Sequence, residues 1–178
     1  TAESHESLEF TNHWVQGHEP TALILQSATG ASIETLDAAR HAADLGVLTV
    51  AMTNTQGSAL EELCNEGICF PTGQRCGPDV SVLTTRLLLL YLLALEIGVS
   101  TGTLSAHEAD ALGHAIGQLP DAAAQFLQDE DLNVSQIANA LKDQRALMMV
   151  GGGPNWFSAR EGALKVEEES SLLCKVYR

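Results

Sequence analysis

Positive charge is scarce in this chain. Its 178 residues include 9 lysines and arginines against 23 aspartates and glutamates, which gives a formal net charge of −14. Nucleic-acid binding needs clustered basic side chains that neutralise phosphates, so the composition argues against a nucleic-acid partner. It also means that any anionic ligand must be held by local geometry against an unfavourable overall field.

Paired metal-ligand motifs are missing as well. The four cysteines, at positions 64, 69, 76 and 174, lack the C-x-x-C spacing of a zinc site. His107, Asp110 and His114 share one face of a predicted helix, but a solvated helix surface explains them better than a metal site does. We therefore expect no bound metal, and reduced thiols in a cytoplasmic protein.

Long hydrophobic runs are also absent. The most apolar run, residues 87–95, is too short to span a bilayer and is bounded by Arg86 and Glu96. No signal peptide is evident, so we expect no membrane partner. Hydrophobic residues nevertheless make up 45% of the chain, which is enough for one full core.

Short apolar runs alternate with helical patterns along most of the chain. Strands are predicted over residues 22–25, 47–52, 68–70 and 146–150. The first helix has an apolar stripe through Ile33, Leu36 and Ala39 and ends at Gly46, and an earlier short helix carrying Phe10 and Trp14 is expected to cover the sheet. Because the strands are apolar throughout, the pattern predicts an α/β fold with a parallel sheet flanked by helices in three layers.

The middle of the chain is predicted to be helical. Residues 79–97 predict one helix that is apolar nearly all round, as expected of a helix buried by its own sheet and by a second subunit in a homodimer. Ser105 and Glu108 fit a capping box that opens the next helix. Two further helices are predicted, over residues 119–127 and, capped by Asn133, residues 133–141. The expected parts are a first α/β unit (1–100), a helical connector (101–142) and the start of a second α/β unit (143–178).

Hydroxyl-bearing residues follow the first predicted strand. Ser27, Thr29 and Ser32 stand in the sequence SATGASIET, residues 27–35, just before a helix. The first backbone N–H groups of a helix lack internal partners and lie at its positive dipole end, so this loop can bind a phosphate. No lysine or arginine occurs between positions 1 and 36, so the donors would be neutral. The alternative is that the hydroxyls only cap the helix, and the local pattern does not separate the two.

This loop resembles the phosphosugar-binding loop of the SIS (sugar isomerase) family, whose pattern is SQSGETxDT. The hydroxyl positions match, while the family's Gln and Glu are Ala28 and Ala31 here. Residues 77–86, GPDVSVLTTR, resemble the family's GPEIGVASTK segment in order and spacing. The resemblance implies a phosphosugar site formed by Ser27, Ala28, Thr29, Gly30, Ser32 and Val82.

Three charged residues line one side of a helix predicted over residues 156–170. Glu161, Lys165 and Glu168 are spaced i, i+4 and i+7, so they form a narrow stripe. A lysine between two carboxylates keeps both ionised, and such a carboxylate beside a bound sugar can move a proton alpha to a carbonyl. Spacing alone, however, favours an ordinary surface salt-bridge ladder.

Residues 151–168 read GGGPNWFSAREGALKVEE, and their glycine spacing does not fit a dinucleotide site. We expect these glycines to let the backbone turn sharply and approach a ligand or a neighbouring chain. The segment resembles a second SIS signature, GRGxNYPxAxEGALKxKE, as found in the isomerase half of glucosamine-6-phosphate synthase. The resemblance implies that Glu168 is the proton-transferring base, supported by Lys165 and Glu161, with no metal or organic cofactor.

The matching segments occur in family order over most of the chain, which resembles the middle portion of a SIS protein with two subdomains. The family's Gly-Thr-Ser loop and His-Gly-Pro segment do not occur in it. The resemblance implies an enzyme that moves a proton between the first two carbons of a hexose 6-phosphate or an amino-sugar phosphate. The alternatives are a deglycase or deaminase acting on an amine-linked sugar phosphate, a phosphosugar sensor without turnover, and a purely structural dimerisation module.

Overall fold

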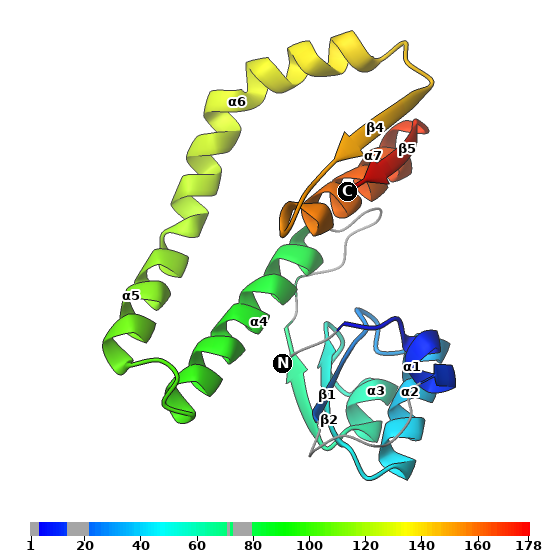
Figure 1. Cartoon of the computed structure of the whole chain (residues 1–178), viewed down its shortest axis with the longest axis vertical. Helices are drawn as coiled ribbons and strands as arrows, with labels where there is room; N and C mark the ends of the chain where they lie inside the picture. Colours follow the sequence, from blue (N-terminus) through cyan, green and yellow to red (C-terminus); the bar gives the residue numbers. More distant parts are fainter. Residues whose placement is uncertain (1–3, 14–21, 71, 73–79) are drawn as a thin grey trace. The chain divides into compact units, whose positions relative to one another are not determined.

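The computed structural model describes residues 4–13, 22–70, 72 and 80–178 (Figure 1). Its contacts divide the chain into two compact units. The first comprises residues 1–75 and 79–90, and the second comprises residues 76–78 and 91–178. Each unit is described by itself. The predicted partner of Phe10, Trp14, lies outside the described residues.

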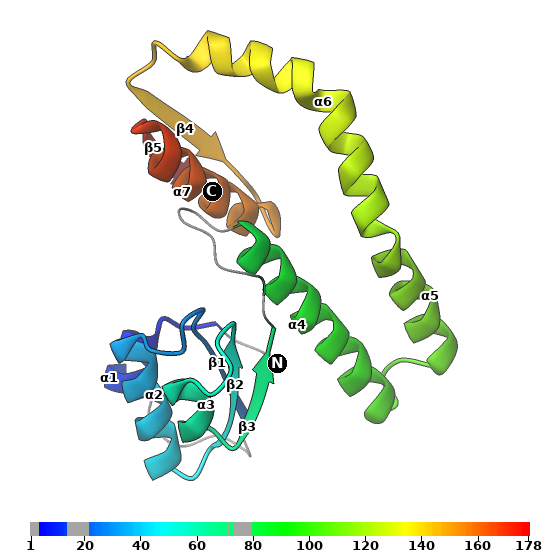
Figure 2. The same ribbon diagram turned by 180° about the vertical axis from the view of Figure 1, so that it is seen from behind.

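The first unit contains a three-stranded parallel sheet in the order β1-β2-β3 (Figures 1 and 2). The strands are β1 (Ala22–Gln26), β2 (Leu48–Thr53) and β3 (Glu66–Cys69). Helix α2 (Ile33–Asp44) connects β1 to β2, and α3 (Ala59–Leu63) connects β2 to β3. The predicted α/β class, a parallel sheet flanked by helices, is confirmed.

The core of this unit is built around small side chains of α2. Ala38, Ala39 and Ala42 are almost fully buried and belong to one cluster with Leu25 of β1 and Leu60 of α3. Small residues allow the helix axis to approach the sheet closely. The buried face of α2 therefore runs through Thr35, Ala38, Ala39 and Ala42.

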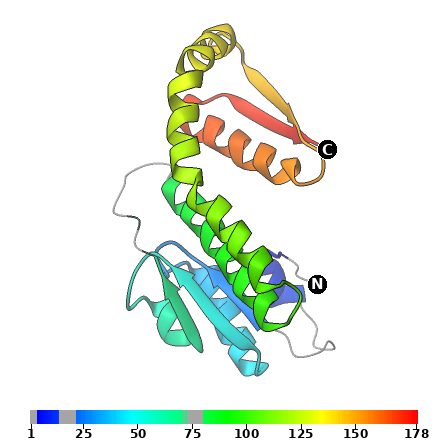
Figure 3. The same cartoon turned by 90° about the vertical axis from the view of Figure 1, so that its left-hand side faces the viewer.

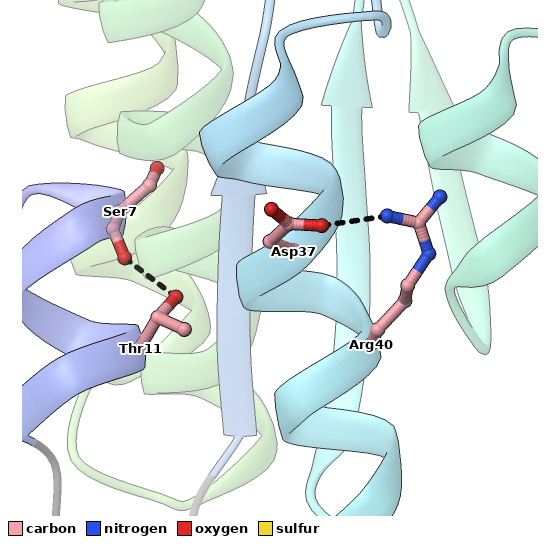
Figure 4. A network of polar contacts seen from close by, with 4 residues as sticks. All are labelled: Ser7, Thr11, Asp37 and Arg40. Atoms are coloured by element: carbon pink, nitrogen blue, oxygen red, sulfur yellow. Dashed lines mark hydrogen bonds and ion pairs between the residues drawn. The ribbon is translucent and has the colours of Figure 1, made fainter.

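Ala39 and Leu36 of the predicted stripe do face the core, but Ile33 at its start does not, because it is 72% exposed. Helix α1 (Ser7–His13) packs beside α2, and its Phe10 joins the core with an edge contact to the His41 ring. Local polar contacts brace both helices (Figure 4): the Thr11 hydroxyl donates to the Ser7 carbonyl at 2.9 Å. Arg40 donates to Asp37 at 2.7 Å.

Helix α4 runs from Val80 to Ser100, three residues beyond the predicted end. Within the described residues it is the helix that is long and apolar enough to cross a membrane, by length and composition, with a mean hydropathy of 1.9 over Ser81–Ser100. Long core helices of soluble proteins meet the same criterion. The predicted burial on all sides is not found in this single chain, where Leu87 is 48% and Tyr91 65% exposed.

The second unit continues with α5 (Ala106–Gly117) and α6 (Leu119–Leu141). The predicted break before residue 133 is wrong, since α6 is continuous. Asn133 does not cap a new helix; its side-chain amide donates to Glu130 at 2.7 Å within the same helix. A polar residue inside a helix can satisfy its side chain along the helix surface, which an N-cap pattern in the sequence does not reveal.

A two-stranded parallel sheet completes this unit. Strand β4 (Ala146–Val150) occupies the predicted residues, and β5 (Leu173–Tyr177) pairs with it in parallel. Helix α7 (Asn155–Ser170) connects the strands and packs against them (Figure 3). Strand β5 was not predicted, although its alternating burial pattern is the usual sign of a strand with one buried face.

The capping box of α5 provides a first testable prediction. The Ser105 hydroxyl accepts from the Glu108 N–H at 3.3 Å, and the Glu108 carboxylate accepts from the Ser105 N–H at 2.9 Å. Ser105→Ala is expected to lower the free energy of unfolding by about 1 kcal/mol in urea titrations. Ser135→Ala, an exposed change inside α6, is the matched control and is expected to cost nothing, because alanine favours a helix interior.

The loss of stability caused by Ser105→Ala should depend on pH. Hydrogen bonds from Ser105 hold the pKa of Glu108 below its usual range. A carboxyl with a lowered pKa in the folded state stabilises the fold above its unfolded pKa of about 4.3 and loses that contribution as the pH falls through the folded value. The difference between the wild type and Ser105→Ala should therefore shrink below about pH 4. A difference that persists there would contradict the charged capping box.

Candidate functional site

The hydroxyl loop lies at the carboxyl edge of the first sheet. Its backbone is joined to the end of β2, since the Ser27 N–H donates to the Met52 carbonyl at 3.1 Å and the Asn54 N–H donates to the Ala28 carbonyl at 3.0 Å. The Thr53 hydroxyl reaches the same Ala28 carbonyl at 3.3 Å. Ser27 and Thr53 thus lie at the carboxyl ends of the neighbouring strands β1 and β2. This is the edge at which open α/β sheets bind ligands.

The structure brings the predicted hydroxyls of this loop together. The Ser27 Oγ lies 2.9 Å from the Ser32 Oγ and accepts from the Gly30 N–H at 3.1 Å. The Thr29 hydroxyl accepts from the Ala31 N–H at 3.2 Å. Ser27 is buried, whereas Thr29 and Ser32 are exposed. The loop thus presents two accessible hydroxyls and is held in shape by a third.

The Ser32 hydroxyl does not cap α2, contrary to the capping alternative. This residue is the N-cap of α2 and has the extended backbone of an N-cap, but its side chain makes no capping hydrogen bond. Its hydroxyl is paired with Ser27 instead. The first amides of α2 therefore lack the side-chain acceptor that an N-cap serine usually supplies.

Gly30 is required at the centre of the loop. Its φ of +63° lies in the left-handed region, and a Cβ at this position would overlap the Ser58 side chain and lie 3.0 Å from the Thr53 hydroxyl. The Gly30 carbonyl also accepts from the Leu60 N–H at 3.0 Å. The loop is thus packed directly on the start of α3.

Ser58 is a residue of this site that the sequence did not identify. It is buried, and its hydroxyl accepts from the Glu61 N–H at 3.4 Å as the N-cap of α3. The sequence signal that could have identified Ser58 is the capping-box pattern Ser58-Ala-Leu-Glu61. Its contact with Gly30 joins residues far apart in the chain, which no local motif reports.

The glycines before α7 serve this chain's own helix. A Cβ on Gly151 would lie 2.5 Å from the Asn155 carbonyl oxygen, and the Gly151 N–H donates to the Tyr177 carbonyl at 3.1 Å. Gly153 has a φ of +55°. Within this chain the backbone at Gly151 closely approaches the first turn of α7 and β5, and its approach to a ligand or a neighbouring chain stays a prediction.

The charged stripe on α7 forms one connected cluster. The Lys165 Nζ lies 2.8 Å from the Glu168 Oε2 and 3.5 Å from the Glu161 Oε1. The hydrogen bond to Glu168 is the main cause that raises the pKa of Lys165. Glu167 lies apart from this cluster, and its carboxylate accepts from the Cys174 N–H at 2.8 Å. The predicted stripe is thus present, with about a third of each carboxylate side chain still exposed.

The predicted site residues fall in both units. The loop residues and Val82, half-buried on α4, belong to the first unit, and the charged stripe belongs to the second. Residues 77–79 of the segment GPDVSVLTTR, which resembles the family's GPEIGVASTK, lie outside the described residues. In the part of the chain that the structure describes, no group of three or more His, Cys, Asp or Glu side chains is arranged to hold a metal ion.

Comparison with known proteins finds relatives over nearly the whole chain. A glutamine–fructose-6-phosphate aminotransferase (isomerizing) from Corynebacterium diphtheriae is 30% identical over 160 residues, which cover 87% of this chain and 25% of that protein. The C-terminal domain of glucosamine-fructose-6-phosphate aminotransferase from Francisella tularensis superposes with a TM-score of 0.89 at 20% identity, over 96% of this chain and 49% of that one.

The chain belongs to the SIS family. No family model matches the sequence, so its membership is carried by the relatives and the fold. The fold is also shared with glucosamine-6-phosphate deaminase from Thermotoga maritima, at a TM-score of 0.70 and 20% identity, over 96% of this SIS chain and 50% of that structure. This SIS chain spans about a quarter of the sequence relative and about half of each structure.

Proposed function

We propose that this SIS chain is part of an enzyme that binds a hexose 6-phosphate or an amino-sugar phosphate and moves a proton between its C1 and C2 carbons. The observation that carries the proposal is the Glu168 carboxylate, held at 2.8 Å by Lys165 in an intact EGALKxxE segment. The relatives named for glutamine–fructose-6-phosphate aminotransferase support the substrate class.

The hydroxyl loop is the proposed phosphate site. Thr29 and Ser32 present exposed hydroxyls beside the amino end of α2, and buried Ser27 is hydrogen-bonded to the Ser32 hydroxyl. Hydroxyl and amide donors neutralise a phosphate only in part, so binding depends on their fixed arrangement. In a chain with a net charge of −14, such local donors are the means by which an anion can be held at this edge.

Glu168 is the proposed base. It would take the proton from one of the first two sugar carbons and return it to the other, so that the aldose and ketose interconvert without net loss of atoms. Lys165 would hold the carboxylate ionised and oriented, with Glu161 as a second partner of that lysine. The proposal includes no metal and no organic cofactor.

A deglycase or deaminase is the second candidate. The deaminase from Thermotoga maritima shares the fold, and removal of an amine from a sugar phosphate can use the same kind of base. A phosphosugar sensor would need the hydroxyl loop but not the Glu168 cluster.

We further propose a homodimer formed through α4 in a soluble, cytoplasmic protein. Four large apolar side chains in the middle of this helix are at least 37% exposed: Leu87, Leu88, Tyr91 and Leu92. A contiguous apolar helix surface of this kind is typical of a subunit interface. Sedimentation of the full-length protein would show a dimer, and Tyr91→Glu would shift it towards the monomer.

The activity is tested by proton exchange in the full-length protein. Incubation with fructose 6-phosphate or glucose 6-phosphate in heavy water is expected to replace the C2 proton of the aldose, followed by NMR. Saturable binding without exchange would favour the sensor. Absence of both binding and exchange would remove the isomerase, the deaminase and the sensor together.

Ser32→Ala separates ligand binding from helix capping. Because the Ser32 side chain makes no capping hydrogen bond, the substitution removes only its 2.9 Å hydrogen bond with Ser27, and the free energy of unfolding should fall by about 0.5–1 kcal/mol. The affinity for the sugar phosphate should fall about fivefold through loss of one donor. Calorimetry measures both, and a loss of stability without a loss of affinity would restore the capping interpretation.

A further inference from the structure

A cavity lies in the second unit, at the amino ends of its strands. The turn from α6 into β4 and the turn from α7 into β5 enter the sheet at the same end (Figures 1 and 2). Between them is a cavity of about 600 Å³. It is lined by Lys142, Gln144, Arg145, Ser170, Ser171, Leu172 and Leu173. This is the end of the strands opposite the Gly151 turn and the start of α7.

Two positively charged side chains, those of Lys142 and Arg145, line this cavity. Lys142 and Arg145 are two of only nine basic residues in a chain of net charge −14. Within the described residues the side chain of neither takes part in an ion pair or a hydrogen bond, whereas the side chains of Arg40 and Lys165 are both paired with carboxylates. Two cations with no anionic partner therefore line the same cavity.

The backbone at the end of α7 adds amide donors. Ser170 ends the helix and Ser171 has φ 59° and ψ 12°, so the two form the right-handed then left-handed pair that turns successive N–H groups into an anion-binding nest. Ser171 is the non-glycine residue with positive φ in the described chain. The C-cap amides of α2, α5 and α6 bond to carbonyls of their own helices, but no such bond is formed by the Ser171 amide. The Leu172 amide makes only a 3.4 Å contact with the Ser170 hydroxyl.

The balance of charges at this end favours an anion. The carboxyl end of α7 carries a partial negative charge of about half a unit, which opposes anion binding. Lys142 and Arg145 together carry two full positive charges, which exceed it. Glu167 accepts from Cys174 and Glu168 from Lys165, so both carboxylates are engaged elsewhere. Asp143 and Glu169 are neighbours of lining residues in the chain and are exposed, but neither lines the cavity.

We infer that this cavity binds the phosphoryl group of a small phosphorylated metabolite. The Arg145 guanidinium can donate hydrogen bonds to two phosphoryl oxygens at the same time, and the Ser171 backbone nest can donate to a third. Lys142 adds a positive charge beside them. A volume of about 600 Å³ is in the range of small-molecule sites, and Leu172 and Leu173 provide an apolar wall for the rest of the ligand. The cavity shares no lining residue with the proposed substrate site, and the inference does not depend on the proposed reaction.

Amide NMR of the full-length protein labelled with ¹⁵N-serine and ¹⁵N-leucine tests this site, with inorganic phosphate as the probe. The Ser171 and Leu172 signals are expected to shift saturably. Arg145→Ala and Lys142→Ala should each weaken the binding read from Ser171 about two- to fivefold, and the double variant about tenfold. Arg40→Ala removes a positive charge from an exposed position in the other unit and is the matched control, with no effect expected at Ser171.

Three results would overturn the inference: no saturable shift of the Ser171 signal, equal weakening in Arg40→Ala and Arg145→Ala, or unchanged binding in the double variant. Circular dichroism of each variant verifies that the fold is kept. Ser171→Gly retains the left-handed backbone and the amide while it removes the hydroxyl, so binding should stay within about threefold of the wild type. The Ser27 and Ser32 signals report the hydroxyl loop separately, so failure at one site is distinguished from failure at the other.

Discussion

Glu168→Gln in the full-length protein is expected to reduce proton exchange at the sugar C2 by about 10²- to 10⁴-fold. Glutamine has nearly the shape of glutamate but is neutral, so it can neither accept the proton nor balance Lys165 at 2.8 Å. The ion pair is part-exposed, so its loss should cost at most about 1 kcal/mol of stability. Affinity for the sugar phosphate should change little, because the phosphate is bound by the hydroxyl loop in this proposal.

Glu169→Gln is the matched control for that experiment. It makes the same chemical change one residue away, at an exposed position on the same helix, and should leave exchange within about twofold of the wild type. Exchange rates are read from the C2 proton signal in heavy water, and affinity is read by calorimetry. Full exchange in Glu168→Gln, or equal losses in both variants, would remove Glu168 from the role of base.

Gly30→Ala is expected to be the most destabilising single substitution in the hydroxyl loop, at about 2–4 kcal/mol in urea unfolding. Two costs add at this position. A φ of +63° is unfavourable for alanine, and the new Cβ would overlap the buried Ser58 side chain and crowd the Thr53 hydroxyl. The loop must then move, so phosphosugar binding should also be lost.

Gly46→Ala separates the two costs. Gly46 has a φ of +70° after α2, but a Cβ there meets no atom within 4 Å. Only the backbone cost remains, and about 1 kcal/mol is expected, with binding unchanged. If Gly30→Ala proves no worse than Gly46→Ala, the tight packing between the loop and α3 does not exist in solution.

Local patterns predicted most of the elements well. The strand at residues 146–150 and the helix after it appear within one residue of their predicted limits, because the apolar run and the glycines that follow it agree there. The predicted helix start at Asn133 was wrong, because the side chain of a residue that often caps helices can instead form a hydrogen bond along the surface of a continuous helix. The division of the chain at residues 100 and 142 stays a prediction.

The residues assigned to the candidate site stay a prediction, and the sequence did not reveal the contacts among them. Ser27, Thr29, Ser32, Lys165 and their neighbours came from motifs whose spacing is local, and the structure places them within those motifs as expected. The contact of Ser58 with Gly30 was missed, since it joins two loops across the sheet edge. The Ser171 amide, which has no partner within the described residues, was missed too. The hydrogen bonding of a backbone amide cannot be read from residue types.

The sequence by itself determined the α/β class, the parallel sheet, the family and the charged stripe of α7. Each of these depends on residues that are near one another in the chain, where helix and strand periods apply directly. Only the tertiary structure decided which face of α2 is buried, that the Ser32 hydroxyl pairs with Ser27, and that two distant turns bring Lys142 and Arg145 to the lining of one cavity. Those features depend on how separate segments pack, and packing is set by the shape of the whole core rather than by any local spacing.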